Sequence, residues 1–126
     1  MSLASLGKQF VELCNQGKNF DVMRQMYAPD IVSVEAGGTE TAGKDAVIKK
    51  SERWAATLTL HGEKVRGPFF SLPDPAATES GQFAVHYTFD VTPKSTNVRA
   101  AQEEVALYTV KNGQITREQF FYQGKW

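Results

Sequence analysis

The chain has 126 residues, and its 14 lysine and arginine residues balance its 14 aspartate and glutamate residues, so the formal net charge at pH 7 is zero. This length suits one domain over residues 1–126 with one hydrophobic core, and the balanced charge argues against a nucleic-acid partner. The single cysteine, Cys14, excludes an internal disulfide and a two-cysteine metal site. No segment resembles a signal peptide or a membrane span, so we expect a cytoplasmic protein with no membrane partner.

The first half of the chain predicts three helices. Apolar residues recur at helical spacing from Leu6 to Cys14, and Gly17 suits the left-handed cap that ends such a helix. Asn19 is the expected cap of a second helix, which Pro29 stops because proline disfavours helix at the residue before it. A short strand is predicted at 31–35, and a third helix follows Gly43-Lys44-Asp45 and ends at Ala56, with Ala46, Val47, Lys50 and Trp54 at helical spacing.

After Trp54 the apolar pattern changes to a period of two, which indicates strands. One strand is predicted at 57–65 and continues through 69–70. Residues 82–91 predict a half-buried antiparallel strand whose apolar side carries Phe83, Val85, Tyr87 and Phe89. The two prolines at 73 and 75 predict a loop between these strands.

Residues 103–122 predict a β-hairpin, because two runs rich in aromatic and β-branched residues flank Asn112-Gly113. Alternation places one carboxylate on the apolar face of each strand. The face of the first strand carries Glu104, Ala106, Tyr108 and Val110, and the face of the second carries Thr116, Glu118, Phe120 and Tyr122. A carboxylate on an apolar face costs free energy unless it is paired, hydrogen-bonded or protonated. The elements together predict an α+β fold in which three N-terminal helices pack in the concave face of a strongly curved, mostly antiparallel sheet.

Four segments resemble the SnoaL-like branch of the NTF2-like superfamily: Leu13 to Gly17, Met26-Tyr27-Ala28-Pro29-Asp30, Gly43-Lys44-Asp45-Ala46, and Glu104 to Tyr122. The resemblance covers nearly the whole chain and implies a cone-shaped fold with an internal pocket for a small hydrophobic molecule. That fold serves ketosteroid isomerases, polyketide cyclases, epoxide hydrolases and dehydratases, and also non-enzymatic binding and association domains.

The resemblance also implies roles for particular positions. The general base of ketosteroid isomerase corresponds to Glu35, and its oxyanion tyrosine corresponds to Phe10, which has no hydroxyl. The second oxyanion donor of that enzyme, a carboxylic acid kept neutral by an apolar site, corresponds to Glu104 when one residue is gapped in the hairpin loop. A catalytic aspartate of SnoaL is placed similarly to Glu118.

Glu104, Glu118 and Glu35 are therefore the predicted catalytic residues. An apolar pocket would move the pKa of a carboxyl toward neutrality, as proton abstraction beside a carbonyl requires. Alternatively, each carboxylate lies at a rim or pairs with Arg99 or Arg117.

Aromatic residues are the other predicted pocket residues, namely Phe10, Tyr27, Trp54, Tyr87, Tyr108, Phe120 and Tyr122. Tyr108 or Tyr122 could supply the hydroxyl that Phe10 lacks, or simply pack in the core. His86 is expected on the outer side of the sheet and His61 on a solvated strand. These two histidines lie 25 residues apart with no clear partner carboxylate spacing, so no metal site is predicted, and acid–base chemistry would need no cofactor.

Two functions remain open from the sequence. The first is acid–base isomerisation, cyclisation or dehydration of a small hydrophobic carbonyl compound, and the alternative is a non-catalytic module that binds a small ligand or another protein. A homodimer is also expected, because the outer sheet face of this fold commonly dimerises and Ala84, His86 and Thr88 suit sheet-on-sheet contact.

Overall fold

A computed structural model describes residues 1–123 of the chain. Its helices are α1 (Leu3–Asn15), α2 (Asn19–Met26) and α3 (Lys44–Ala56), with a short 3-10 helix η1 (Pro75–Ala77). Its strands are β1 (Tyr27–Val34), β2 (Glu40–Ala42), β3 (Leu58–Phe70), β4 (Gly81–Pro93), β5 (Ala100–Lys111) and β6 (Gln114–Phe121).

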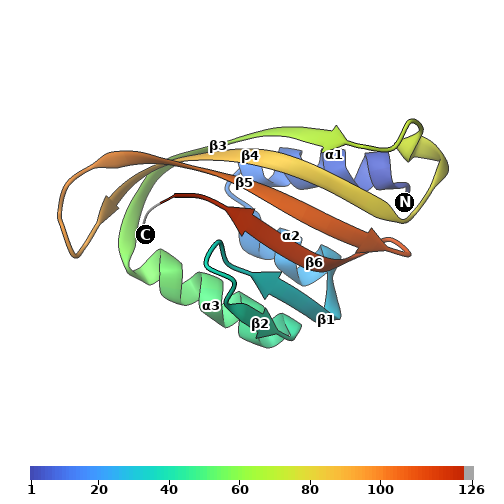
Figure 1. The fold of residues 1–126 in the computed structure, drawn as a ribbon. Coiled ribbons are helices and arrows are strands. Elements are labelled where there is room, and N and C mark those ends of the chain that lie inside the picture. The colour runs from blue at the N-terminus through green and yellow to red at the C-terminus, as the bar shows by residue number, and fades with distance from the viewer. Residues whose placement is uncertain (124–126) are drawn as a thin grey trace.

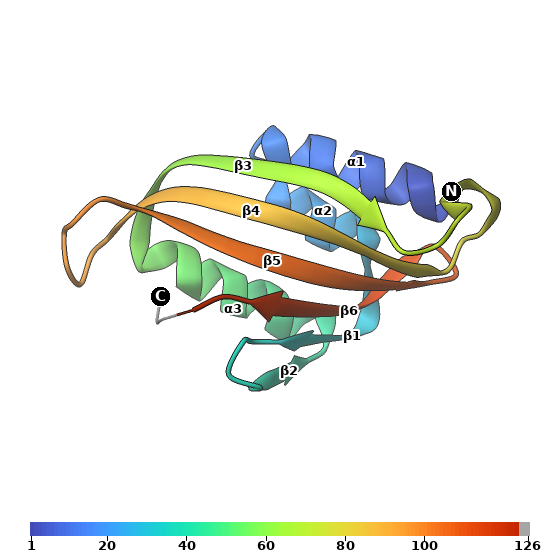
Figure 2. The same ribbon diagram turned by 45° about the horizontal axis from the view of Figure 1, so that its top comes forward.

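The strands form one sheet in the order β2-β1-β6-β5-β4-β3. Neighbouring strands are antiparallel except β1 and β6, which pair in parallel. The long strands β3, β4 and β5 arch over the helices in Figure 1, and in Figure 2 all three helices lie behind the same face of the sheet. The predicted α+β fold with helices in the concave face is confirmed.

The apolar core joins the first half of α1 to the inner face of β4 and β5. Leu3, Leu6 and Phe10 are fully or almost fully buried there. The ring of Phe10 lies 5.4 Å from that of Phe83 and 4.6 Å from that of Tyr108, measured between ring centroids. These contacts anchor α1 on the sheet, and Phe10 marks the point where the packed core gives way to a cavity.

Two predictions about α2 are wrong. Asn19 is the first helical residue rather than the cap, and its side-chain amide donates a hydrogen bond to Glu63 on β3, with a distance of 2.7 Å between nitrogen and oxygen. The helix ends at Met26, before Pro29, because Tyr27 already pairs with Ile115 of β6. Tertiary partners decide both positions. The short strand β2, which pairs with β1, was not predicted from the sequence.

The β5–β6 hairpin is confirmed, with positive φ angles of 52° at Asn112 and 79° at Gly113. The predicted face of β6 is wrong at its start. A register shift lets Ile115 pair with Val110 and places Ile115, rather than Thr116, in the core. Among residues 1–123, no helix is both long enough and apolar enough to cross a membrane.

Candidate functional site

A cavity of about 270 Å³ lies between the helices and the inner face of the sheet. Its walls come from α1, α2 and α3 and from strands β1 and β3 to β6, so it is bordered by segments distant in the sequence. The structure places every residue predicted for the site around this cavity: Glu35, Glu104, Glu118, Phe10, Tyr27, Trp54, Tyr87, Tyr108, Phe120 and Tyr122.

Glu118 on β6 is the most deeply buried of the carboxyl groups, with 1% of its surface exposed. Parallel pairing of β1 with β6 puts Ser33 opposite Glu118, and the Ser33 hydroxyl donates to one carboxyl oxygen at 2.6 Å. The Tyr27 hydroxyl donates to the other oxygen. Burial raises the pKa of Glu118, while the hydrogen bonds from Ser33 and Tyr27 and the charge of Lys50 oppose that rise.

Lys50 on α3 links Glu118 to Glu35. Its ammonium lies 2.6 Å from a carboxylate oxygen of Glu35, 2.5 Å from the Ser33 hydroxyl and 3.9 Å from Glu118. The Tyr122 hydroxyl donates to the second oxygen of Glu35 at 3.0 Å. Burial and the bond to Glu35 raise the pKa of Tyr122 to about 12, so this phenol keeps its proton at neutral pH.

The alternative in which arginines pair with the predicted carboxylates does not hold. Arg99 forms its ion pair with Asp90, and Arg117 lies 3.8 Å from Glu40, both at the protein surface. The cation beside the predicted site is Lys50, which the sequence analysis did not assign to it. The helical spacing of Lys50 with Val47 and Trp54 was the pattern that could have predicted its inward position.

Glu104 on β5 differs from the other two predicted carboxyl groups. It is half-buried opposite Tyr87 of β4, and no group within residues 1–123 donates a hydrogen bond to its carboxyl. Burial, followed by the negative charges of Glu35 and Glu118, raises the pKa of Glu104 to about 8. The carboxyl is therefore mostly protonated at pH 7, which makes it a hydrogen-bond donor facing the cavity.

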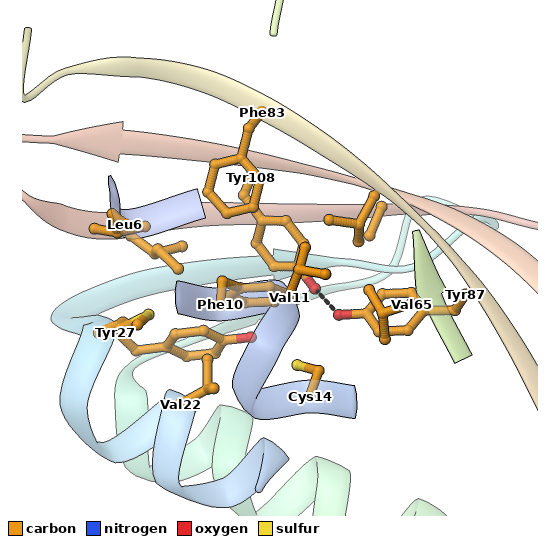
Figure 3. Packing of buried hydrophobic residues seen from close by; sticks show 14 of the residues in the cluster. Leu6, Phe10, Val11, Cys14, Val22, Tyr27, Val65, Phe83, Tyr87 and Tyr108 are labelled. Atoms are coloured by element: carbon orange, nitrogen blue, oxygen red, sulfur yellow. Dashed lines mark hydrogen bonds between the residues drawn. The ribbon is translucent and has the colours of Figure 1, made fainter. Parts of the chain in front are cut away.

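A pair of phenols lies beside Phe10, where the resemblance to ketosteroid isomerase predicts a missing hydroxyl. The hydroxyls of Tyr87 and Tyr108 are 2.7 Å apart, as the dashed line in Figure 3 marks, and the Tyr108 ring contacts Phe10. Burial is the main cause that raises the pKa of both tyrosines, so both keep their protons. Hydroxyl donors thus reach this part of the cavity from the sheet instead of from α1.

The comparisons with known proteins agree with this architecture. The family model of the SnoaL-like domain matches residues 1–122. The chain belongs to the SnoaL-like family. A solved structure from Mesorhizobium loti, named as a candidate SnoaL-like polyketide cyclase with carbohydrate phosphatase in brackets, is 41% identical to this SnoaL-like protein and superimposes with a TM-score of 0.86. The match covers 97% of this chain and 100% of that one.

More distant structures share the fold with this SnoaL-like protein. A candidate polyketide cyclase from Xanthomonas campestris is 18% identical, with a TM-score of 0.73 over 96% of this chain and 90% of that one. A protein from Catenulispora acidiphila with a ketosteroid isomerase-like fold, solved with trimethylamine, is 15% identical, with a TM-score of 0.62 over 92% and 84% of the two chains. A search of curated proteins found no match.

Sequence reasoning also missed Glu63, a fourth carboxyl group on the cavity wall. Burial raises its pKa to about 6, against the opposing effect of the hydrogen bond from Asn19. The alternation of Glu63 with the buried Val65 was the signal for its inward face.

The two histidines lie outside the cavity wall. His61 contacts the Thr92 hydroxyl, and His86 lies within 3.4 Å of Glu103 on the outer face of the sheet. Among the described residues, no three His, Cys, Asp or Glu side chains are grouped so that they could hold a metal ion.

Proposed function

We propose that this SnoaL-like protein is an acid–base enzyme that moves a proton within a small hydrophobic carbonyl compound, in an isomerisation, cyclisation or dehydration. The observation that carries the proposal is the Glu104 carboxyl, which has a pKa of about 8 and faces the same cavity as the Lys50-bound carboxylate of Glu35. A neutral acid and a charged base on one cavity wall are the two groups that enolisation requires.

Proton transfer would begin at Glu35. Its carboxylate accepts a proton from the carbon beside the substrate carbonyl, and the electrons of the broken C–H bond form the carbon–carbon double bond of an enolate. The carbonyl π electrons move onto oxygen, where protonated Glu104 donates a hydrogen bond. Return of the proton from Glu35 to another carbon completes an isomerisation and restores both groups. The resemblance-based positions of Glu35 and Glu104 support these roles.

Lys50 and Tyr122 hold Glu35 in this proposal. Both donate to its carboxylate, so they fix the orientation of the base. Glu118 has a supporting role, because only 1% of its surface is exposed, whereas 30% of the Glu35 side chain is exposed. It holds the Lys50 ammonium toward Glu35 rather than touching the ligand.

The size and walls of the cavity support a small, mostly apolar substrate. Its volume of about 270 Å³ lies at the lower edge of ordinary ligand pockets. Aromatic rings from α1, α3 and the sheet form much of the wall, including Phe10, Trp54 and Phe120. A one- or two-ring ketone meets both conditions.

A non-catalytic binding module is the second function, and Phe10 favours it. The residue at the position of the oxyanion tyrosine has no hydroxyl, and the phenol of Tyr108, whose ring contacts Phe10, already bonds to the phenol of Tyr87. In that function the same cavity sequesters an apolar ligand without converting it.

The conversion of a β,γ-unsaturated cyclohexenone into its conjugated isomer, followed by ultraviolet absorbance, tests the proposal. We expect Glu104→Gln and Glu35→Gln each to lower kcat by about 10²- to 10⁴-fold, the usual effect of removing a general acid or base. Glu103→Gln is the matched control, because Glu103 is the exposed neighbour of Glu104 on the opposite face of β5. Circular dichroism shows whether each variant is folded.

Wild-type rates in both folded cavity variants would refute the assigned roles. If the wild-type protein binds the ketone, measured by calorimetry, without converting it, the binding module replaces the enzyme as the function.

A further inference from the structure

One end of the cavity is formed by β3, the start of α2 and the end of α1, where Glu63, Asn19 and Cys14 line the wall. Asn19 donates a hydrogen bond to one oxygen of the Glu63 carboxyl. Within residues 1–123, no lysine, arginine or histidine lies within ion-pair distance of Glu63. Among the described residues, Glu63 is thus a half-buried carboxylate that accepts a hydrogen bond but has no counter-ion.

The charges along the cavity wall do not balance. Besides the mostly protonated Glu104, the carboxyl groups of Glu35, Glu63 and Glu118 line it, whereas Lys50 is the cation among the described lining residues. The Lys50 ammonium is already held by Glu35 and Ser33. A carboxylate taken partly out of water costs free energy unless a cation or enough hydrogen bonds compensate it. Glu63, which is mostly ionised at pH 7.5 with its pKa of about 6, lacks that compensation.

Aromatic rings surround the same end of the cavity. Phe89 is the direct cross-strand partner of Glu63, and the Phe89 ring stacks on Tyr87 with 5.2 Å between ring centroids. Trp54 of α3 meets Phe89 edge-on at 5.4 Å. A carboxylate next to aromatic rings attracts organic cations, because the negative charge of the carboxylate and the negative potential of the ring faces both attract positive charge.

We propose that the ligand of this cavity is an apolar molecule with a positively charged amine, and that the amine binds at Glu63 beside the rings of Phe89 and Trp54. A neutral hydroxyl could also donate a hydrogen bond to Glu63, but it would leave the negative charge uncompensated. The proposal rests on the proposed function in one respect, namely that the cavity takes up a small molecule.

This arrangement also orients the ligand. Glu104 is the cross-strand partner of Tyr87, and Glu63 is the partner of Phe89, so the two carboxyl groups flank the stacked Tyr87–Phe89 pair on opposite sides. An amine held at Glu63 therefore directs the rest of the molecule along the rings toward Glu104. The substrate class becomes a carbonyl compound whose basic nitrogen is separated from the reacting carbon by a short apolar stretch.

Calorimetric binding of phenethylamine and phenethyl alcohol at pH 7.5 tests the proposal, since the two probes have similar size but only the amine is charged. We expect the amine to bind the wild-type protein at least about tenfold more tightly than the alcohol. Glu63→Gln should lose this preference, because glutamine keeps a carbonyl that can accept from Asn19 but has no negative charge to attract the amine. Glu103→Gln, on the outer face, should behave like the wild type.

Each result separates this proposal from the proposed function. Equal affinity of the wild-type protein for both probes overturns the amine proposal, while Glu104-dependent isomerisation of the cyclohexenone would still stand. A Glu63-dependent preference for the amine without any isomerisation supports the amine proposal and refutes the enzyme. If neither phenethylamine nor phenethyl alcohol binds the wild-type protein, the amine proposal is refuted, and the cyclohexenone assay decides separately on the enzyme. The wild-type comparison decides the question even if Glu63→Gln does not fold.

Discussion

Glu104→Gln should make the protein more stable at alkaline pH. The wild-type carboxyl is protonated in the folded cavity until about pH 8 but ionises near pH 4.5 in the unfolded chain. Between these values the unfolded state binds fewer protons than the folded state, so the free energy of unfolding falls as pH rises. This loss of unfolding free energy is complete above about pH 8 and absent below about pH 4.5. Glutamine does not titrate, so the variant lacks this loss.

The magnitude follows from the two pKa values. At 1.36 kcal/mol for each pH unit, the difference between about 8 and 4.5 corresponds to about 5 kcal/mol at most. Water reaches the half-buried carboxyl and weakens the effect, so we expect Glu104→Gln to exceed the wild type by about 2–3 kcal/mol at pH 9. At pH 4 the two proteins should differ by less than about 1 kcal/mol, because both carry a neutral group at this position.

Urea unfolding at pH 4, 7 and 9 measures this difference. Burial also raises the pKa of Glu63 and of Glu118, and these effects lower stability in the same direction, but they are common to both proteins and largely cancel. Glu103→Gln reports the effect of removing an exposed carboxylate from the same strand. A stability difference between Glu104→Gln and the wild type that does not change with pH would refute the assigned pKa and, with it, the neutral acid in the proposed mechanism.

Three further predictions follow from other parts of the structure. Lys50→Met should lower the free energy of unfolding by about 3 kcal/mol at pH 7, because Glu118 would lose its nearby cation inside the protein. Lys49→Met, at an exposed position, is the control. Equal urea midpoints for the two variants would contradict the reasoning. Cys14 should resist a thiol reagent at pH 8 in the folded protein and react at once in urea, since burial raises its pKa. We also propose that the outer sheet face forms a homodimer, so Val105→Lys, a change at a residue 42% exposed on that face, should convert a dimer into a monomer in sedimentation; a monomeric wild type at micromolar concentration would refute the dimer.

The sequence predicted the fold well wherever one periodicity ran without interruption. The alternation in β4 and β5 put Phe83, Tyr87 and Tyr108 on the buried face, and the Asn112-Gly113 turn set the hairpin. The prediction from the sequence was wrong where one extra residue enters a strand. The register shift near Thr116 reverses the faces at the start of β6, and nothing in the local pattern announces it.

The polar contacts of the site could not be predicted in the same way. Periodicity tells which face a side chain occupies, but a hydrogen bond also needs a partner at a definite distance. Lys50 meets Glu35 because α3 crosses β1, and Asn19 meets Glu63 because α2 starts beside β3. Both pairs join segments whose relative positions appear only after the sheet has curved around the helices.

The contrast between Glu104 and Glu118 shows why such partners matter for function. Both are glutamates on the inner face of the same hairpin, and burial raises the pKa of each. Glu118 accepts hydrogen bonds from Tyr27 and Ser33 and lies within 3.9 Å of Lys50, so its carboxyl has a structural role. Glu104 has none of these contacts among the described residues, and its proton remains available to whatever enters the cavity. The proposed chemistry of the site therefore depends on the carboxyl group that has no such partner among the described residues, and the stability that its removal should restore measures the free-energy cost of keeping it there.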